Sequence, residues 1–288
     1  MDESYEVSSE LAEVWRRFKK NKFAMAGLVI LAFILLTAIF APLIVDYDTQ
    51  VIGQNLQNRL QRPSAEHPFG TDNFGRDIMA RVIYGSRISL VIGFFAVGVS
   101  LLIGGAIGTV SAYFRGPLDN VLMRIMDVFM AVPSILLALA IVAALGPGLV
   151  NVTIAMTISF VPAYARLLRS LVLPIKDMEY IEAARVTGVS VQRIILLHIL
   201  PNTMGPILVQ STLAVGRIII MAAGLSFLGL GVIPPAPEWG AMLSEGRIFM
   251  RGSPYIVISP GLAIIVTVLA LNLLGDGLND ALDPRLNN

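Results

Sequence analysis

Cysteine is absent from this chain of 288 residues, and histidine occurs only twice, as His67 and His198. Without cysteine there are no disulfides, thiolate metal sites or cysteine nucleophiles, and two histidines cannot form a site that needs several. Charged residues are scarce, at 14% against about 25% in a typical soluble protein. The formal net charge of +1 gives no sign of a nucleic-acid partner. With 56% hydrophobic residues, the composition is that of a membrane protein.

The sequence is rich in long apolar runs. Because a helix needs about twenty apolar residues to cross the hydrocarbon core, the runs predict an all-α polytopic membrane protein with six spans. These cover Ala24–Val45, Ile88–Tyr113, Val121–Leu145, Val150–Leu171, Ile207–Val232 and Tyr255–Gly275. The first run is too long for the apolar part of a signal peptide and has no good cleavage site, so we expect it to be retained as a span.

The predicted spans are nearly free of ionisable residues. Asp127 and Asp276 lie at span ends, and Arg217 is the only charge well inside an apolar run. Ion-driven carriers usually place such residues at mid-membrane, which argues against a self-powered carrier, although backbone carbonyls alone can bind ions. An intramembrane protease is also disfavoured, because there is no HExxH, no aspartate pair at mid-membrane and no span with both serine and histidine. We therefore expect the energy for any uphill transport to come from another protein.

Lysine and arginine are unevenly distributed between the two sides of the predicted spans. One side carries a dense basic stretch before the first span and further basic residues in its loops and tail: Arg16, Arg17, Lys19, Lys20, Lys22, Arg115, Lys176, Arg185, Arg193 and Arg285. The arginines of the other side are mostly spread over longer loops: Arg59, Arg62, Arg76, Arg81, Arg87, Arg247 and Arg251. Because basic residues favour the cytoplasmic side, both termini are predicted to be cytoplasmic.

This orientation divides the chain into segments. We expect a cytoplasmic N-terminal segment (1–23), a six-span domain (24–275) that includes an external loop (46–87) and a cytoplasmic loop (172–206), and a cytoplasmic tail (276–288). The N-terminal segment has an amphipathic stripe typical of a helix at the membrane interface: Val7, Leu11, Val14 and Phe18. Within the external loop, Asp77–Arg87 is expected to form a helix along the outer interface.

Two features inside the spans concern packing and charge. Small residues recur at every fourth position of the second span: Ala96, Ser100, Gly104, Gly108 and Ala112. Such a ribbon lets another helix approach closely, most simply one of the same chain. Arg217 allows two interpretations, since it either faces a water-filled pathway and contacts an anionic solute, or snorkels or pairs at a subunit contact. We favour the second, because isolated membrane charges are satisfied in several ways.

The loop between the fourth and fifth spans, "EYIEAARVTGVSVQRIILLHILPN", is too short and too polar to cross a bilayer. Pro174 is expected to end the preceding helix, and Asp177 to cap a new helix over Met178–Thr187. Gly188 is expected to end that helix, because glycine readily adopts the left-handed conformation found at helix C-termini.

A second short helix is expected to follow, capped by Ser190 and ended by Pro201. Its apolar face is spaced as i, i+3, i+4 and i+7: Val191, Ile194, Ile195 and His198. We therefore interpret His198 as a packing residue. The loop is predicted to be a compact helix-turn-helix of the kind that fills a groove on a partner.

The spacing of this loop resembles the EAA loop of the membrane subunits of ATP-binding-cassette importers, in which EAA, glycine, isoleucine and Leu-Pro recur at fixed distances. The matching residues are Glu182, Ala183, Ala184, Gly188, Leu200 and Pro201. His198 departs from the general pattern but is similar to the peptide-transporting branch. Three more stretches resemble the C-type subunits of dipeptide, oligopeptide and nickel permeases: Phe18–Leu31, His67–Leu90 and Leu225–Leu243.

This resemblance implies the six-span fold of a type I importer permease. It also implies that the first helix of the loop rests in a cleft on an ATPase subunit. There Glu182 makes a polar contact, Ala183 and Ala184 allow close approach, and Gly188 sets the turn. The coupling residues implied are Glu179, Glu182, Ala183, Ala184, Gly188, His198, Leu200 and Pro201.

The resemblance further implies several partners in a bacterial or archaeal cell membrane. They are a B-type permease subunit, two ATPase subunits and an external solute-binding protein. The chain has no GxxxxGK[ST], so we expect no cofactor and no catalysis here, with ATP and magnesium bound by the ATPases. Peptides are the expected solute, because they are the larger branch and the spans lack metal ligands. Nickel stays open, as do an ion-driven carrier and a membrane scaffold.

Overall fold

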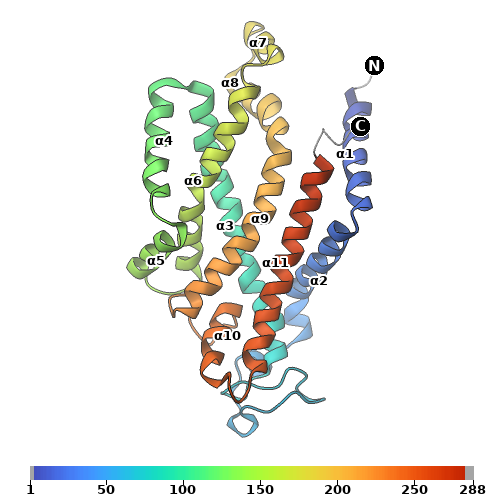
Figure 1. Cartoon of the computed structure of the whole chain (residues 1–288), viewed down its shortest axis with the longest axis vertical. Coiled ribbons are helices and arrows are strands. Elements are labelled where there is room, and N and C mark those ends of the chain that lie inside the picture. The colour runs from blue at the N-terminus through green and yellow to red at the C-terminus, as the bar shows by residue number, and fades with distance from the viewer. Residues whose placement is uncertain (1–2, 283–288) are drawn as a thin grey trace.

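The computed structural model describes residues 3–282, with side chains from residue 12 onward. The described residues form helices and connecting loops and contain no β-strand (Figure 1). The helices are α1 (Glu3–Lys20), α2 (Lys22–Ile44), α3 (Ile78–Phe114), α4 (Gly116–Met130), α5 (Ser134–Leu145), α6 (Leu149–Ile175), α7 (Glu179–Val186), α8 (Val191–Ile194), α9 (Leu200–Phe227), α10 (Trp239–Gly246) and α11 (Tyr255–Leu282). The all-α fold class is therefore confirmed.

Among the described residues, five helical stretches are long and apolar enough to span a membrane: α2, α3, α6, the stretch from α8 through α9, and α11. The predicted span Val121–Leu145 is instead a bent pair, because α4 and α5 meet at an angle of 84°. The break lies just before Pro133, which cannot donate a backbone hydrogen bond and disfavours a helical conformation at Val132. The bent pair is either one broken span or a re-entrant loop, so the described residues contain five or six spans, and six is the number predicted from the sequence.

The prediction of a separate interfacial helix over Asp77–Arg87 is wrong. Asp77 is the N-cap of α3, and the residues after it form the first part of that helix. Asp77 caps that helix, its carboxylate accepting a hydrogen bond of 2.8 Å from the Ala80 amide. His67 Nδ1 lies 2.7 Å from Asp77 Oδ2 and ties the preceding loop to the cap. Helix α3 thus extends from this loop across the whole bundle (Figure 1).

The ribbon of small residues in α3 lies against α6 of the same chain. A Cβ atom added at Gly104 would lie 2.4 Å from the Val161 carbonyl oxygen, and one at Gly108 would lie 2.1 Å from that of Ala165. Ser100 Oγ donates a hydrogen bond of 2.9 Å to the Thr157 carbonyl. The remaining members, Ala96 and Ala112, are fully buried. Absence of side-chain bulk therefore sets the distance between the two helices.

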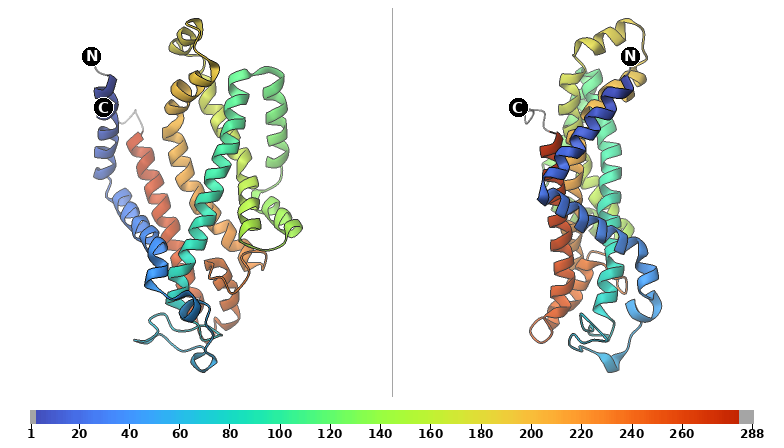
Figure 2. Two further views of the ribbon diagram at one scale, coloured as in Figure 1. Left: turned by 180° about the vertical axis from the view of Figure 1, so that it is seen from behind. Right: turned by 90° about the vertical axis from the view of Figure 1, so that its right-hand side faces the viewer.

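The main core lies where α3, α6 and α9 meet, and its fully buried members include Ile92, Met156, Ile218 and Leu225. Helix α11 packs along α9, and α2 packs along α11 at the edge of the bundle (Figures 1 and 2). At the start of α2, Phe18 of α1 packs with Ala24 and Ala281. Of the predicted N-terminal stripe, Val14 is half-buried, whereas Val7 and Leu11 lie outside the residues with described side chains.

The two ends of the bundle carry different parts of the chain. Helices α1, α7 and α8 and the C-terminal end of α11 lie at one end (Figures 1 and 2). The loop 46–77 and α10 lie at the other end. The described part of 1–23 and the segment 172–206 thus lie at the same end, and the assignment of that end to the cytoplasm stays a prediction.

Candidate functional site

The segment after α6 projects beyond the other helices as α7 (Figure 1). Helix α6 includes Pro174 and ends at Ile175, and the N-cap of α7 is Met178, which makes no side-chain capping bond. The predicted cap, Asp177, instead pairs with Arg115 at 2.6 Å. This ion pair tethers the start of α7 to the residue that follows α3.

An apolar cluster holds α7 in place. We call it the elbow cluster; its members are Ala112 of α3, Val172 of α6, Ile181 of α7, Ile194 of α8 and Ile199. All five side chains have no solvent exposure. Full burial of such a side chain contributes about 1.5–3 kcal/mol, and Ala184 packs partly against the same group. Helix α7 is therefore attached to two spans through an apolar contact of its own.

The turn after α7 depends on Gly188. Its φ of +79° lies in the left-handed region, which costs other residues roughly 1–2 kcal/mol. Its amide donates to the Arg185 carbonyl at 3.0 Å, and the Val189 amide donates to the Ala184 carbonyl at 3.1 Å. No atom lies within 4 Å of a Cβ added here, so the backbone conformation, rather than space, requires glycine.

The exposed surface of α7 carries both acidic and apolar residues. Glu179, Glu182 and Ala183 are exposed, and Val186 is 85% exposed. Arg185 is turned toward α3, where its guanidinium lies 5.4 Å from the centre of the Tyr113 ring. The tip of the loop therefore exposes two carboxylates and the apolar side chain of Val186, whereas Arg185 packs against α3.

The prediction that Pro201 ends the second helix is wrong. Helix α8 passes through a π-helical turn, Ile195–Ile199, directly into α9, so that Val191–Phe227 is one continuous helical stretch. Pro201 has no amide hydrogen to donate to the preceding turn, and it lies just after this π-helical turn, at the start of α9. Leu200 and His198 are half-buried, and the His198 carbonyl accepts a hydrogen bond of 2.6 Å from Asn202.

Polar contacts near the loop connect the ends of α3, α4 and α6. Arg169 of α6 donates to both oxygens of Asp119 in α4, each at 2.7 Å, and Ser111 of α3 donates to the same carboxylate. Lys176 Nζ donates to the Tyr113 carbonyl at 3.0 Å, and burial lowers the pKa of this lysine. Sequence patterns did not indicate these pairs, since the partners are far apart in the chain.

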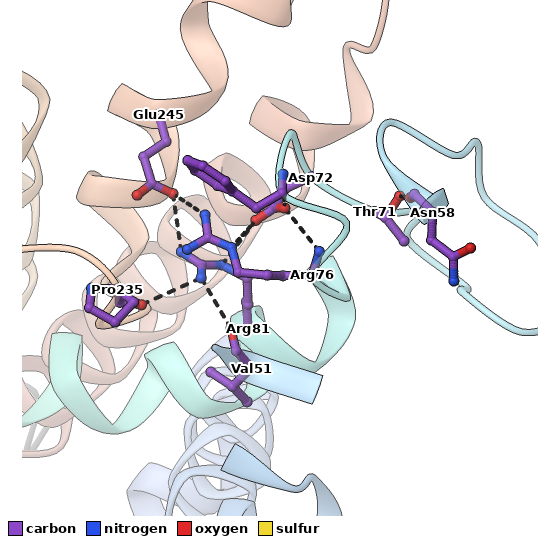
Figure 3. Close-up of polar contacts among 9 residues, drawn as sticks. Val51, Asn58, Thr71, Asp72, Arg76, Arg81, Pro235 and Glu245 are labelled. Carbon is purple, nitrogen blue, oxygen red and sulfur yellow. Dashed lines mark hydrogen bonds and ion pairs between the residues drawn. The ribbon is translucent and has the colours of Figure 1, made fainter. Parts of the chain in front are cut away.

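A second cluster, at the opposite end of the bundle, consists of charged residues (Figure 3). We call Asp72, Arg76, Arg81 and Glu245 the ion cluster. Arg76 contacts Asp72 at 2.5 Å and Glu245 at 2.7 Å, and Arg81 contacts Glu245 at 3.2 Å. Both arginine side chains are 2% exposed. The Val51 carbonyl also accepts from Arg81 at 3.1 Å, so the cluster joins the loop 46–77 to α3 and α10.

Two protein families match parts of this chain. Residues 100–288 match the family "Binding-protein-dependent transport system inner membrane component", and residues 9–63 match "N-terminal TM domain of oligopeptide transport permease C". The chain belongs to this permease family. It is thus a membrane component of the importers that couple to ATPases and binding proteins.

Two curated relatives are similar over nearly the whole permease. The dipeptide transport system permease protein DppC of Alkalihalophilus pseudofirmus is 48% identical, covering 100% of this chain and 94% of the relative. The glutathione transport system permease protein GsiD of Escherichia coli O6:K15:H31 is also 48% identical, covering 98% and 92%. Among solved structures, an inward-facing MetNI methionine ABC transporter matches with TM-score 0.58 and 18% identity, covering 69% of this chain and 94% of that one. This last likeness supports the fold.

Arg217 of the permease lies in the middle of α9 and is exposed. No carboxylate among the described side chains lies within ion-pair distance of it. The side chain therefore needs water or a counter-charge from outside the chain.

Proposed function

We propose that this chain is the C-type permease subunit of an ATP-driven importer and forms half of a translocation pathway for peptides. The proposal is supported by membership of the permease family and by two relatives named for a dipeptide and for glutathione, which is itself a peptide. A nickel or other small-solute permease of the same family is the alternative.

The coupling mechanism rests mainly on one observation, the continuous helical path from the projecting α7 into α9. In the proposed complex, α7 sits in a cleft on an ATPase subunit, with Glu182 and Glu179 in polar contact and Ala183 close to the partner. Closure of the ATPase pair displaces α7, and the elbow cluster passes this displacement to α3, α6 and α9. ATP shifts the equilibrium only insofar as it interacts differently with the inward- and outward-facing states.

The proposed assembly contains this subunit, a B-type permease subunit, two ATPases and an extracytoplasmic solute-binding protein. The end that carries α7 is cytoplasmic, and the end with the ion cluster faces the binding protein. ATP and magnesium belong to the ATPases, so this subunit performs no catalysis. Its contribution is mechanical.

The test is reconstitution of the transporter in proteoliposomes with and without the ATPases and the binding protein. We expect uptake of dialanine or glutathione to require ATP and all subunits. Uptake driven by an ion gradient alone would establish a secondary carrier instead, and uptake of nickel but of neither peptide would establish the alternative solute.

A variant of the loop tests the coupling role in the same system. Ala184→Arg places a long charged side chain against the elbow cluster, and we expect it to reduce uptake and peptide-stimulated ATP hydrolysis while the protein still inserts and assembles. Ser170→Arg, at an exposed position on the neighbouring α6, is the matched control. Normal uptake by Ala184→Arg would contradict the docking of this loop.

A further inference from the structure

Helices α11, α3 and α6 of the same chain pack against α9. Gly216 lies against Val268 and Leu271 of α11, and Val215 and Ile219 lie against Gly93 of α3. On the α6 side, the Tyr164 hydroxyl donates a hydrogen bond of 3.2 Å to Ser211 Oγ. These contacts leave Arg217 and Ile220 exposed.

The side of α9 that these contacts leave exposed carries Arg217 and Gln210 beside the apolar Ile220, which is 52% exposed. Gln210, Arg217 and Gly224 are seven residues apart, so successive members point within about 20° of each other and lie about 10 Å apart along the helix. Arg217 is exposed, whereas Gln210 and Gly224 are half-buried. We call these three residues the open face of α9. The surface of α2 differs in this respect, because its exposed mid-helix positions are apolar and include Val29, Phe33 and Leu36, whereas α9 exposes an arginine among its apolar residues.

A guanidinium at this depth has to be compensated, because an arginine at the centre of a bilayer is strongly unfavourable. Within the described side chains no carboxylate is near enough to do so. The compensating group therefore comes from outside the chain, as water, a partner residue or a solute. The neighbouring Gln210 and the small Gly224 leave polar groups and space beside Arg217, which suits a solute that arrives hydrated.

We propose that the open face of α9 lines the translocation pathway and that Arg217, with Gln210, binds a carboxylate of the passing peptide. This inference rests on the proposed function. Guanidinium groups bind carboxylates through two parallel hydrogen bonds, which an ammonium does not reproduce. Every unmodified peptide carries a C-terminal carboxylate, so the contact recognises a group common to all such substrates. Because the site is wetted during transport, the contact is brief and speeds passage without trapping the solute.

The first experiment compares dialanine with its C-terminal amide in proteoliposomes that hold the complete transporter. Both are supplied at concentrations that saturate the binding protein, so that its own preference does not enter. We expect wild type to transport dialanine faster than the amide. Arg217→Gln should lower the rate of dialanine uptake roughly tenfold and change the rate of amide uptake little. Arg217→Lys should restore part of the rate.

The outcomes separate the alternatives. An unchanged ratio of dialanine to amide in Arg217→Gln would overturn the proposal. Equal loss for both substrates, together with poorer recovery of the second permease subunit on purification, would assign Arg217 to a subunit contact. If wild type takes up neither dialanine nor glutathione, the proposed function itself fails.

The second experiment uses the absence of cysteine from the chain. A cysteine introduced at Gln210 is the only thiol of this subunit, and thiolates form in water rather than in lipid. We expect Gln210→Cys to react with a charged thiol reagent and to be protected by dialanine and the loaded binding protein. Val29→Cys, on the exposed surface of α2, is the control and should not react. An unreactive Gln210→Cys would place the open face of α9 against lipid or protein and contradict the inference.

Discussion

At one end of the bundle, apolar side chains of the elbow cluster hold α7 onto α3 and α6. At the other end, the four charged residues of the ion cluster hold the loop 46–77 onto α3 and α10. Apolar contact has no preferred direction and scales with the area covered, so it survives small rotations of one element over another. A buried ion network needs each donor opposite its acceptor. The first end is thus suited to movement, and the second to a fixed shape.

The largest expected effect comes from breaking the ion cluster. Glu245→Gln leaves Arg76 and Arg81 buried with one carboxylate, and removal of one partner from a buried network costs about 3–5 kcal/mol. We expect the melting temperature of the purified subunit in nanodiscs to fall by several degrees. Glu66→Gln, an exposed carboxylate of the same loop, should melt as wild type does. If both variants have the melting temperature of wild type, the ion cluster does not stabilise this end.

The elbow cluster should respond differently. Ile181→Ala removes a side chain with no exposure, which typically costs about 2–5 kcal/mol. Because α7 lies at the end of the bundle, we expect this loss of stability to be local. Backbone amides of residues 179–189 should exchange hydrogen faster, whereas the melting temperature of the spans should not change. Val186→Ala, at an 85% exposed position of the same helix, should leave exchange unchanged. Uniform destabilisation of the spans would show that the two ends are not independent.

A smaller effect is expected at the turn. Gly188→Ala forces an alanine into the left-handed region, at a cost of roughly 1–2 kcal/mol. We expect a severalfold fall in peptide-stimulated ATP hydrolysis by the assembled transporter. Gly188→Asn should retain more activity, because asparagine adopts this conformation more readily. Equal activity of all three proteins would mean that the angle between α7 and α8 is not used in coupling.

The smallest effect sharpens the contrast between the two kinds of charge pair. Asp177 and Arg115 lie 2.6 Å apart but are each about half exposed. Exposed pairs contribute about 0–1 kcal/mol, so Asp177→Asn should change the melting temperature by less than Glu245→Gln does. Repeating the measurement in high salt should remove even that difference, because exposed charges are screened. A loss as large as that of Glu245→Gln would refute the distinction between the two ends.

Much of the fold follows from the sequence, because hydropathy is a strong signal over twenty residues. The errors occur where proline and amphipathic patterns have more than one outcome. Pro133 accompanies a break between helices, whereas Pro201 is accommodated just after a π-helical turn in a continuous helical stretch. The local rule is the same at both places, and only the surrounding packing decides between them. Asp77–Arg87 looked interfacial because its polar face belongs to a buried network that the sequence does not reveal.

The site is predicted less completely than the fold. Gly188 and the helix of Glu182 follow from local turn chemistry, which a short stretch contains in full. The ion cluster does not, since Arg81 and Glu245 are separated by 164 residues. Its only local trace is the density of charge before α3. The partners of a buried charge pair are brought together only by the fold. Such pairs are therefore the part of the site that cannot be predicted from the sequence and has to be read from a structure.

The unbroken helical stretch Val191–Phe227 has a consequence for the scale of motion. Its 37 residues make a rod about 55 Å long at 1.5 Å per residue. Pivoting such a rod by about 10° around its middle carries each tip roughly 5 Å, about one helical turn, in opposite directions. A modest tilt applied at the nucleotide-driven end therefore suffices to move the far tip by the width of an amino-acid side chain.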